Sequence, residues 1–231
     1  MNKIKMGISL EIIGISGALA STIALKAPYN YVLTTISCIL LIVAFVSLLR
    51  EKLRIKPKLE LIQACKNLGI VKIIETEYYH QMNEKIANAK NIKIIADTAH
   101  ALIINQETGI VKALENNAII KILLAKVDSP YLKDLEILDG RKSGALTIEI
   151  NQTLERLKAI RKQTNKGMLE IKFFSTHHRL TCVLCDDWCW LTLTIPPRRS
   201  YNSPSLEIQK TKENGLYAYC NKHFDEIWMK L

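Results

Sequence analysis

The clearest pattern along the chain is a pair of long apolar runs close to its start. Gly7–Leu25 contains a single acidic residue, Glu11, and Tyr31–Leu49 contains no charged residue. Built as α-helix, each run would extend about 28 Å, close to the thickness of the hydrocarbon core of a bilayer. We therefore expect two transmembrane helices, and we favour them over a cleaved signal peptide because the second apolar run follows so closely.

The remainder of the chain alternates between strand-like and helix-like patterns. Short apolar runs typical of buried strands lie at Asn91–Asp97, Ala118–Lys126 and Met168–Phe174. Helical spacing of apolar residues separates them, at Glu75–Lys90, Asn105–Asn117 and Leu146–Gln163. Arg179–Leu184 and Trp188–Ile195 are expected to pair as a hairpin across Asp186 and Asp187. This order predicts an α/β, or mixed α+β, domain behind two N-terminal transmembrane α-helices.

Basic residues flank the apolar runs and set an expected orientation. Lys3 and Lys5 precede the first run and a basic segment begins at Arg50, whereas the connector Lys26–Asn30 carries little charge. The positive-inside rule then places both termini in the cytoplasm, as in a two-pass protein of the inner (cytoplasmic) membrane. The expected domains are a transmembrane hairpin over residues 1–50, a basic juxtamembrane segment over 51–68 and a cytoplasmic domain over 69–231.

The charge balance of the chain is strongly basic, with a formal net charge of +10. A basic excess suits either anionic membrane lipid or a phosphate-bearing ligand, and charge alone does not choose between them. Small residues between Gly14 and Ser21 are typical of membrane helices that approach closely, and they predict a homo-oligomer formed through the transmembrane helices. Cysteines on the cytoplasmic side are expected to be reduced, so no disulfide framework is predicted.

Several sequence segments within the predicted strands and helices resemble those of a known protein family. They are ANAKNIKIIADTAHALI, ALENNAIIKILLAKVDSP, GMLEIKFFSTHHRLTCVLCDD, SYNSPSLEI and HFDEIW, and with their spacing they extend from about Gly69 to the last residues. In order and spacing these phrases resemble the phospholipase D-like fold. The resemblance implies a single domain of that fold, and in active members of the family a His-x-Lys-x4-Asp motif supplies the nucleophile and the phosphate-binding lysine.

The catalytic motif that this resemblance implies is broken in the chain. Counting from His178, the lysine position holds Leu180 and the aspartate position holds Cys185, and His100 is followed by Leu102 where the lysine would stand. We therefore expect a degenerate domain and favour a non-catalytic role. A membrane-anchored phosphodiesterase or phospholipase with an unorthodox site, and a lipid-binding scaffold, are the alternatives.

Small polar and basic residues around the broken motif form the candidate ligand-binding set. Neighbouring guanidinium groups donate to phosphate in a planar fork, although a solvated basic loop is the plainer interpretation of the arginines. Polar residues that follow a buried strand lie where ligands collect in open α/β sheets. The set is Thr98, His100, His178, Arg179, Arg198, Arg199, Ser200, Asn202 and Ser203.

Cysteine and histidine pairs offer a different, metal-binding chemistry. Cys182-x2-Cys185 and Cys220-x2-His223 have the ligand types and pair spacing of a structural zinc site. Cysteine is also a common core residue, and strand alternation places Cys182 on a face that it shares with leucines. We therefore expect buried thiols with no metal and no cofactor, and we keep the zinc set as the alternative.

The expected layout, two spans followed by a degenerate phosphate-binding domain, resembles the two-span membrane effectors of bacterial anti-phage nucleotide-signalling systems. It implies a membrane-anchored sensor that binds a phosphorylated small molecule, with a cyclic oligonucleotide as the candidate, and that controls the spans. No DNA or RNA duplex is expected among its partners.

Overall fold

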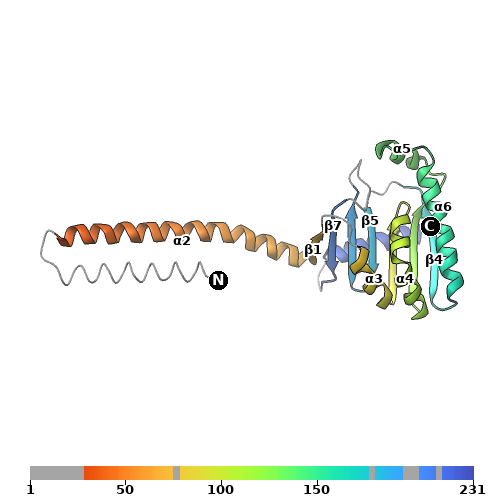
Figure 1. Cartoon of the computed structure of the whole chain (residues 1–231), viewed down its shortest axis with the longest axis horizontal. Coiled ribbons are helices and arrows are strands. Elements are labelled where there is room, and N and C mark those ends of the chain that lie inside the picture. The colour runs from red at the N-terminus through yellow and green to blue at the C-terminus, as the bar shows by residue number, and fades with distance from the viewer. Residues whose placement is uncertain (1–28, 75–78, 177–179, 195–202, 212–214) are drawn as a thin grey trace. The chain divides into compact units, whose positions relative to one another are not determined.

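The structure is a computed structural model, and it describes residues 29–74, 79–176, 180–194, 203–211 and 215–231. The chain separates into two compact units, Met1–Gln63 and Ala64–Leu231. Helix α2 (Tyr29–Leu68), 40 residues long, contains the boundary between the two units (Figure 1). The larger unit holds all the described strands.

Helix α2 contains the second of the predicted transmembrane spans. Its apolar part, where Ile42 and Phe45 are exposed, continues without a break into the basic segment that begins at Arg50. Within the residues that the structure describes, no helix is both long enough and apolar enough to cross a membrane. The predicted transmembrane pair is therefore wrong, and the two-pass membrane localisation and the oligomer through those helices fall with it. The first predicted span, Gly7–Leu25, lies outside the described residues.

The larger unit is built on a seven-stranded sheet. Its strands, in spatial order, are β1 (Ile70–Ile74), β7 (Ser205–Gln209), β6 (Trp188–Leu193), β5 (Leu180–Cys185), β2 (Asn91–Ala96), β3 (Ile119–Ala125) and β4 (Met168–Phe174). β2, β3 and β4 are parallel to one another, and the remaining neighbours pair antiparallel. The mixed α+β character predicted for this domain is confirmed.

Helices pack on both faces of the sheet (Figure 1). They are α3 (Tyr79–Asn88), α4 (His100–Glu115), α5 (Pro130–Leu138), α6 (Ala145–Gln163) and α7 (Leu216–Lys230). α3 and α4 share one apolar core with the sheet, α5 and α7 share the other, and α6 contributes side chains to both. Helices separate the parallel strands along the chain: α4 connects β2 to β3, and α5 and α6 connect β3 to β4. Two parallel strands need such a long crossover because the chain must return to the same end of the sheet.

Strand alternation decides which residues enter which core. On β2, Ile92 and Ile94 lie in the core shared with α3 and α4, whereas Ile95 lies in the core shared with α7. On β5, Val183 belongs to the first core and Cys182 to the second. Both faces of these central strands are therefore buried, as expected for strands that read as nearly continuous apolar runs.

The predicted hairpin across Asp186 and Asp187 is confirmed as the β5–β6 pair, in which Leu184 lies opposite Cys189. Asp186 adopts a left-handed backbone conformation, with φ of 47°. Its carboxylate accepts the backbone N–H groups of Lys90 and Asn91, each at 2.9 Å. The turn is thereby tied to the start of β2, which fixes the hairpin against the parallel half of the sheet.

Candidate functional site

A pocket opens at the carboxyl-terminal end of β2, where ligands collect in open α/β sheets. Its volume is about 140 Å³, room for about ten water molecules at roughly 10–15 Å³ of accessible volume each. The wall combines the segment after β2, the start of α4, the inner residues of β5 and β6, and the approach to α6. The polar and aromatic lining residues are Asp97, Thr98, His100, Asp139, Arg141, Glu149, Thr181, Trp190, Thr192 and Thr194.

The amino terminus of α4 forms one wall of the pocket. Ala99, the residue before the helix, has φ of 52°, a left-handed conformation that alanine rarely adopts. Ala99 has no side-chain group to cap α4, and the Thr98 hydroxyl accepts a long hydrogen bond of 3.4 Å from the His100 backbone N–H. A helix start of this kind directs backbone N–H donors and a partial positive charge toward the pocket.

A network of charged groups forms the opposite wall. The Nη1 atom of Arg141 lies 2.9 Å from a carboxylate oxygen of Glu149, and its Nε lies 3.9 Å from an oxygen of Asp139. Glu149 also accepts the Thr98 hydroxyl at 3.2 Å, which links the network to the end of β2. One guanidinium therefore faces several carboxyl groups, since Asp97 lines the same pocket. The balance of formal charge in the pocket is acidic.

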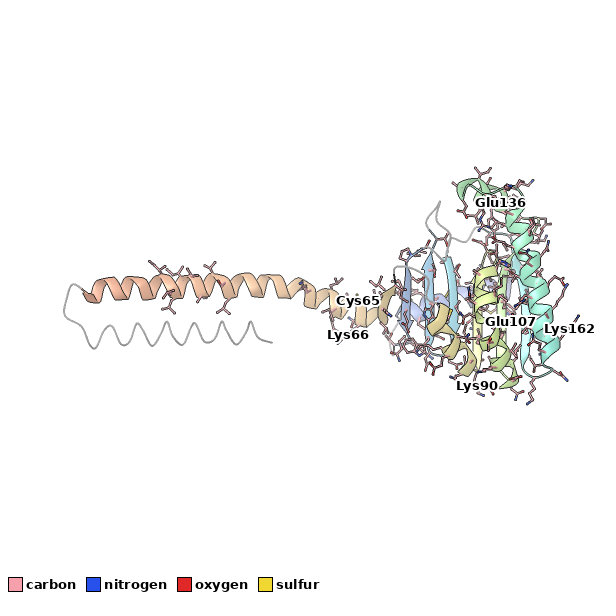
Figure 2. The ribbon with its side chains drawn as sticks, viewed as in Figure 1. Cys65, Lys66, Lys90, Glu107, Glu136 and Lys162 are labelled. Atoms are coloured by element: carbon pink, nitrogen blue, oxygen red, sulfur yellow. The ribbon has the colours of Figure 1, made fainter. Side chains whose placement is uncertain are left out.

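The position of this network depends on Glu136, a buried carboxylate of α5 (Figure 2). Its two oxygens accept the backbone N–H groups of Gly144 at 2.9 Å and of Leu146 at 2.8 Å. These N–H groups belong to the start of α6, which lacks other acceptors within its own turn. Glu136 therefore caps α6 from a distance and holds the segment that carries Arg141 and Glu149.

Asp97 is the most strongly perturbed carboxyl group of the pocket. Burial raises its pKa from 3.8 to about 7, a hydrogen bond from the Tyr131 hydroxyl lowers it, and the charge of Asp139 raises it. The Tyr131 hydroxyl donates to Asp97 at 3.4 Å. At neutral pH this carboxyl group can accordingly either donate or accept a hydrogen bond, which is typical of functional sites.

Trp190 supplies an aromatic wall and a polar atom without an acceptor. Its side chain is 2% exposed, and within the described residues its indole N–H meets no hydrogen-bond acceptor. A buried donor that lacks an acceptor costs about 1–3 kcal/mol, so an indole N–H in this position points to an acceptor that arrives with a ligand or with water.

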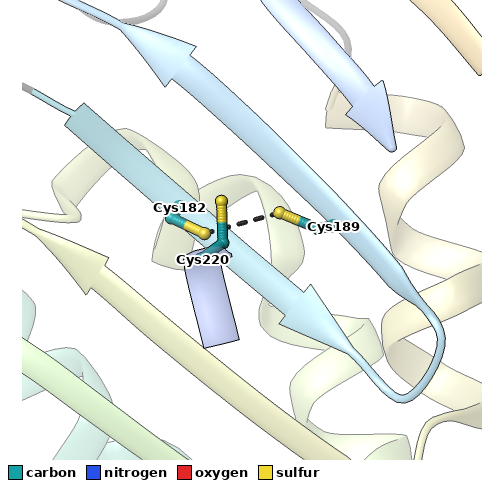
Figure 3. A group of neighbouring side chains, drawn as sticks. All are labelled: Cys182, Cys189 and Cys220. Atoms are coloured by element: carbon teal, nitrogen blue, oxygen red, sulfur yellow. Dashed lines mark hydrogen bonds between the residues drawn. The ribbon is translucent and has the colours of Figure 1, made fainter. Parts of the chain in front are cut away.

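A second cluster of reactive groups lies on the other face of the same hairpin. The Sγ atoms of Cys182 (β5), Cys189 (β6) and Cys220 (α7) lie within 4.8 Å of one another, and Cys182 and Cys189 are 3.5 Å apart (Figure 3). Hydrogen bonding among the thiols raises the pKa of Cys182 and lowers the pKa of Cys220, with a further lowering from the charge of His223. Of these two thiols, Cys220 therefore loses its proton more readily than Cys182.

The structure regroups the cysteines that the sequence paired. Cys182 and Cys185 are three residues apart on β5, so they lie on opposite faces of the sheet, and Cys185 enters the core shared with α3 and α4. Burial raises the pKa of Cys185. Cys189 takes its place beside Cys182, while Cys220 and His223 lie one turn apart on α7. The hairpin register could have identified Cys189 from the sequence. Leu191 lies opposite Cys182 on β6, and Cys189, two residues before Leu191, lies on the same face of the sheet.

Of the predicted ligand-binding residues, Thr98 and His100 line the pocket. Ser203 is buried, at 2% exposure, just before β7. The others lie outside the described residues: His178, Arg179, Arg198, Arg199, Ser200 and Asn202. The sequence reasoning missed Arg141, Glu149 and Trp190, because nothing in their local pattern distinguishes them from surface or core residues.

No protein-family model matches the chain, and no curated protein matches it. Among solved structures, the chain is similar to TrmBL2, an archaeal chromatin protein described as showing a novel mode of DNA binding. The identity is 21% and the TM-score is 0.44, over 84% of this chain and 68% of that chain. At this distance the likeness gives the chain neither a function nor a partner.

These comparisons correct the predicted family and partners. The phospholipase D-like resemblance is wrong, since no family model supports it. The order of strands and helices that suggested it is common to many α/β sheets, and the motif that would have made it specific is broken. The membrane-effector function and the membrane-lipid partner are wrong as well, since no described helix could cross a membrane. The cyclic-oligonucleotide partner and the exclusion of a nucleic-acid duplex fall with the family resemblance.

Proposed function

We propose that the pocket at the end of β2 binds a small, uncharged molecule that carries hydroxyl or amide groups. The observation that carries this proposal is the indole N–H of Trp190, which is buried in the pocket wall and meets no acceptor among the described residues. The predicted residues Thr98 and His100 are part of the same proposed contact surface.

The donors of the pocket call for acceptors on the ligand. Trp190 offers its indole N–H, and the start of α4 after Ala99 offers backbone N–H groups. An ammonium group could not satisfy these donors, because it has no lone pair to accept a hydrogen bond. The ligand must therefore present oxygen acceptors to this side of the pocket.

The acidic groups of the pocket call for donors on the same ligand. Asp97, Asp139 and Glu149 line the wall, and Arg141 is already engaged by the last two. An anion such as phosphate would lie close to these carboxyl groups, and repulsion between like charges would weaken its binding by up to several kcal/mol. Hydroxyl and amide groups both donate and accept, so they fit both sides.

Thermal unfolding of the full chain with a panel of probes tests this function. Polyols and monosaccharides form the hydroxyl arm, simple carboxamides form the amide arm, and inorganic phosphate and a diamine form the charged arms. We expect a concentration-dependent rise in melting temperature with at least one probe of the uncharged arms, because binding to the native state alone stabilises it. A rise with phosphate or the diamine alone would contradict the proposal.

Trp190→Phe supplies the residue-level test with the best probe. The ring stays and the N–H is lost, so we expect about tenfold weaker binding, the equivalent of one hydrogen bond. Trp188→Phe is the matched control: it lies two residues away on the same face of β6, contacts Lys85 and does not line the pocket. Equal affinity in the two variants would show that the indole N–H of Trp190 takes no part in binding.

A further inference from the structure

We propose that Cys182, Cys189 and Cys220 bind one zinc ion, with His223 as the fourth ligand. This site is independent of the pocket, because it lies on the other face of the sheet and uses none of the pocket residues. It would join α7 to the β5–β6 hairpin and so have a structural role.

The sulfur atoms lie close to the separations that zinc requires. Tetrahedral zinc holds thiolates at about 2.3 Å, which places any two sulfurs about 3.8 Å apart. The Sγ atoms of Cys182 and Cys189 are 3.5 Å apart, and all three Sγ atoms lie within 4.8 Å of one another.

The fold brings the three thiols together from distant parts of the chain. Cys182 and Cys189 are diagonal neighbours across the hairpin, because Leu184 lies opposite Cys189 in the register. Cys220 comes from α7, which shares the same apolar core, and its side chain lies beside those of Cys182 and Cys189 (Figure 3). Convergence of ligands from a hairpin and a helix is the arrangement of many structural zinc sites.

The fourth ligand follows from the helix. His223 lies three residues after Cys220, so the two side chains share a face of α7. Cys182 and Cys189 are 1% and 0% exposed, whereas Cys220 is partly exposed. The open side of the cluster is therefore the α7 side, where an imidazole can complete a closed, four-coordinate site.

The alternative is a core filled with three neutral thiols, since buried cysteine is a common small apolar residue. The two possibilities differ in metal content. We expect the full chain, purified without chelator after growth with zinc, to contain one zinc ion per chain by inductively coupled plasma mass spectrometry. The cobalt-substituted protein should show the absorption of tetrahedral thiolate coordination. Wild-type protein with zinc far below one ion per chain, after incubation with zinc, would overturn the proposal.

Matched cysteine variants connect the ion to these residues. Cys220→Ala should bind zinc more than about 100-fold more weakly, beyond the roughly 10–100-fold that outer-shell changes cost. Cys65→Ala, also on a helix and also partly exposed, should keep the wild-type affinity. Far-ultraviolet circular dichroism checks that both variants fold. Equal zinc affinity in the two variants would refute the site.

Two further variants separate ligand loss from damage to the core. Cys185→Ser alters a buried thiol on the opposite face of β5, so it should reduce stability while zinc remains bound. His223→Ala should weaken zinc binding but leave the thiolate absorption of the cobalt form. Loss of zinc from Cys185→Ser in folded protein would contradict the assignment of the ligands, and unchanged affinity in His223→Ala would refute the fourth ligand.

Discussion

The two faces of the β5–β6 hairpin carry different chemistry although they arise from the same short stretch, Leu180–Leu193. One face presents Thr181, Val183 and Trp190 to a polar pocket, and the other presents Cys182 and Cys189 to α7. The two sets of residues interleave along the chain, and Val183 and Trp190 belong to one apolar core while Cys182 and Cys189 belong to the other. Strand periodicity alone separates them.

The comparison teaches how to interpret a dense cluster of reactive residues in a sequence. The cysteines and tryptophans between Cys182 and Trp190 are close in sequence, so they suggest a single site. On a strand, each step of one residue changes the face, so neighbours in sequence are assigned to different sites. The pocket and the thiol cluster should accordingly respond to different substitutions.

The largest expected effect comes from a substitution on the face of the β5–β6 hairpin that lines the pocket. Trp190→Ala should lower the free energy of unfolding by about 3–5 kcal/mol, because it empties a large buried volume in the core shared with α3 and α4. Urea unfolding followed by circular dichroism measures it. Trp188→Ala, on a partly exposed side chain, should cost less. A larger cost at Trp188 would reverse the assignment of the two rings.

The second prediction concerns the support of the pocket by Glu136. Glu136→Gln replaces one of two acceptors by an N–H₂ group that faces an N–H donor, and it should cost about 2 kcal/mol of unfolding free energy. Binding in the pocket should weaken while zinc content stays constant. Glu155→Gln, an exposed residue of α6 paired with Lys158, is the control and should leave stability nearly unchanged. Equal costs would show that Glu136 does not hold α6.

The third prediction uses pH to sharpen the pocket face. The pKa of Asp97 is raised from 3.8 to about 7, so the native state binds this proton more tightly than the unfolded state. Stability contributed by Asp97 is therefore present in full below about pH 4, falls as pH rises toward 7, and is lost above it. Asp97→Asn removes this dependence, and Tyr131, Asp139, Arg141 and Glu149 remain as the charged or titratable groups around it.

The measurement is the unfolding free energy of wild type and Asp97→Asn across this range. We expect the variant to match wild type near pH 4 and to exceed it by about 1–2 kcal/mol at pH 8. This gain is smaller than a fully buried carboxyl group would give, because Asp97 lines a pocket and is partly exposed. A difference that is largest at low pH would have the wrong sign and would exclude a raised pKa.

The smallest expected effect lies at the turn that joins the two faces. Asp186→Ala removes the carboxylate that accepts two backbone N–H groups at the start of β2, and it should cost about 1 kcal/mol because the group is exposed. Asp187→Ala removes only a surface ion pair with Lys210 at 3.8 Å and should cost about 0.3 kcal/mol. Chemical denaturation compares the two variants, and a greater loss at Asp187 would contradict the tie to β2.

Periodicity predicted the mixed domain and the hairpin well, because each depends on local patterns. The runs at Ile92–Ala96 and Ile120–Ala125 are apolar on both faces, as buried parallel strands require, and Asp186-Asp187 marks the turn. The same local approach failed at α2, where an apolar run is the first part of a 40-residue helix that continues through charged residues.

The sites were less predictable because they depend on contacts between distant segments. Cys189 joins Cys182 through the hairpin register, and Cys220 joins them only because α7 covers that face. Arg141 and Glu149 reach the pocket through the capping of α6 by Glu136. No local spacing records these contacts, and a wrong family resemblance directed attention to residues outside the described part of the chain.

The central claim is that one hairpin carries two independent sites, and the melting-temperature shift caused by the best uncharged probe tests it most directly. The shift should be reduced in Trp190→Phe and should keep its wild-type size in Cys220→Ala, because only the first residue lines the pocket. A shift that falls equally in both variants, or that survives in Trp190→Phe and disappears in Cys220→Ala, would contradict the separation of the two faces.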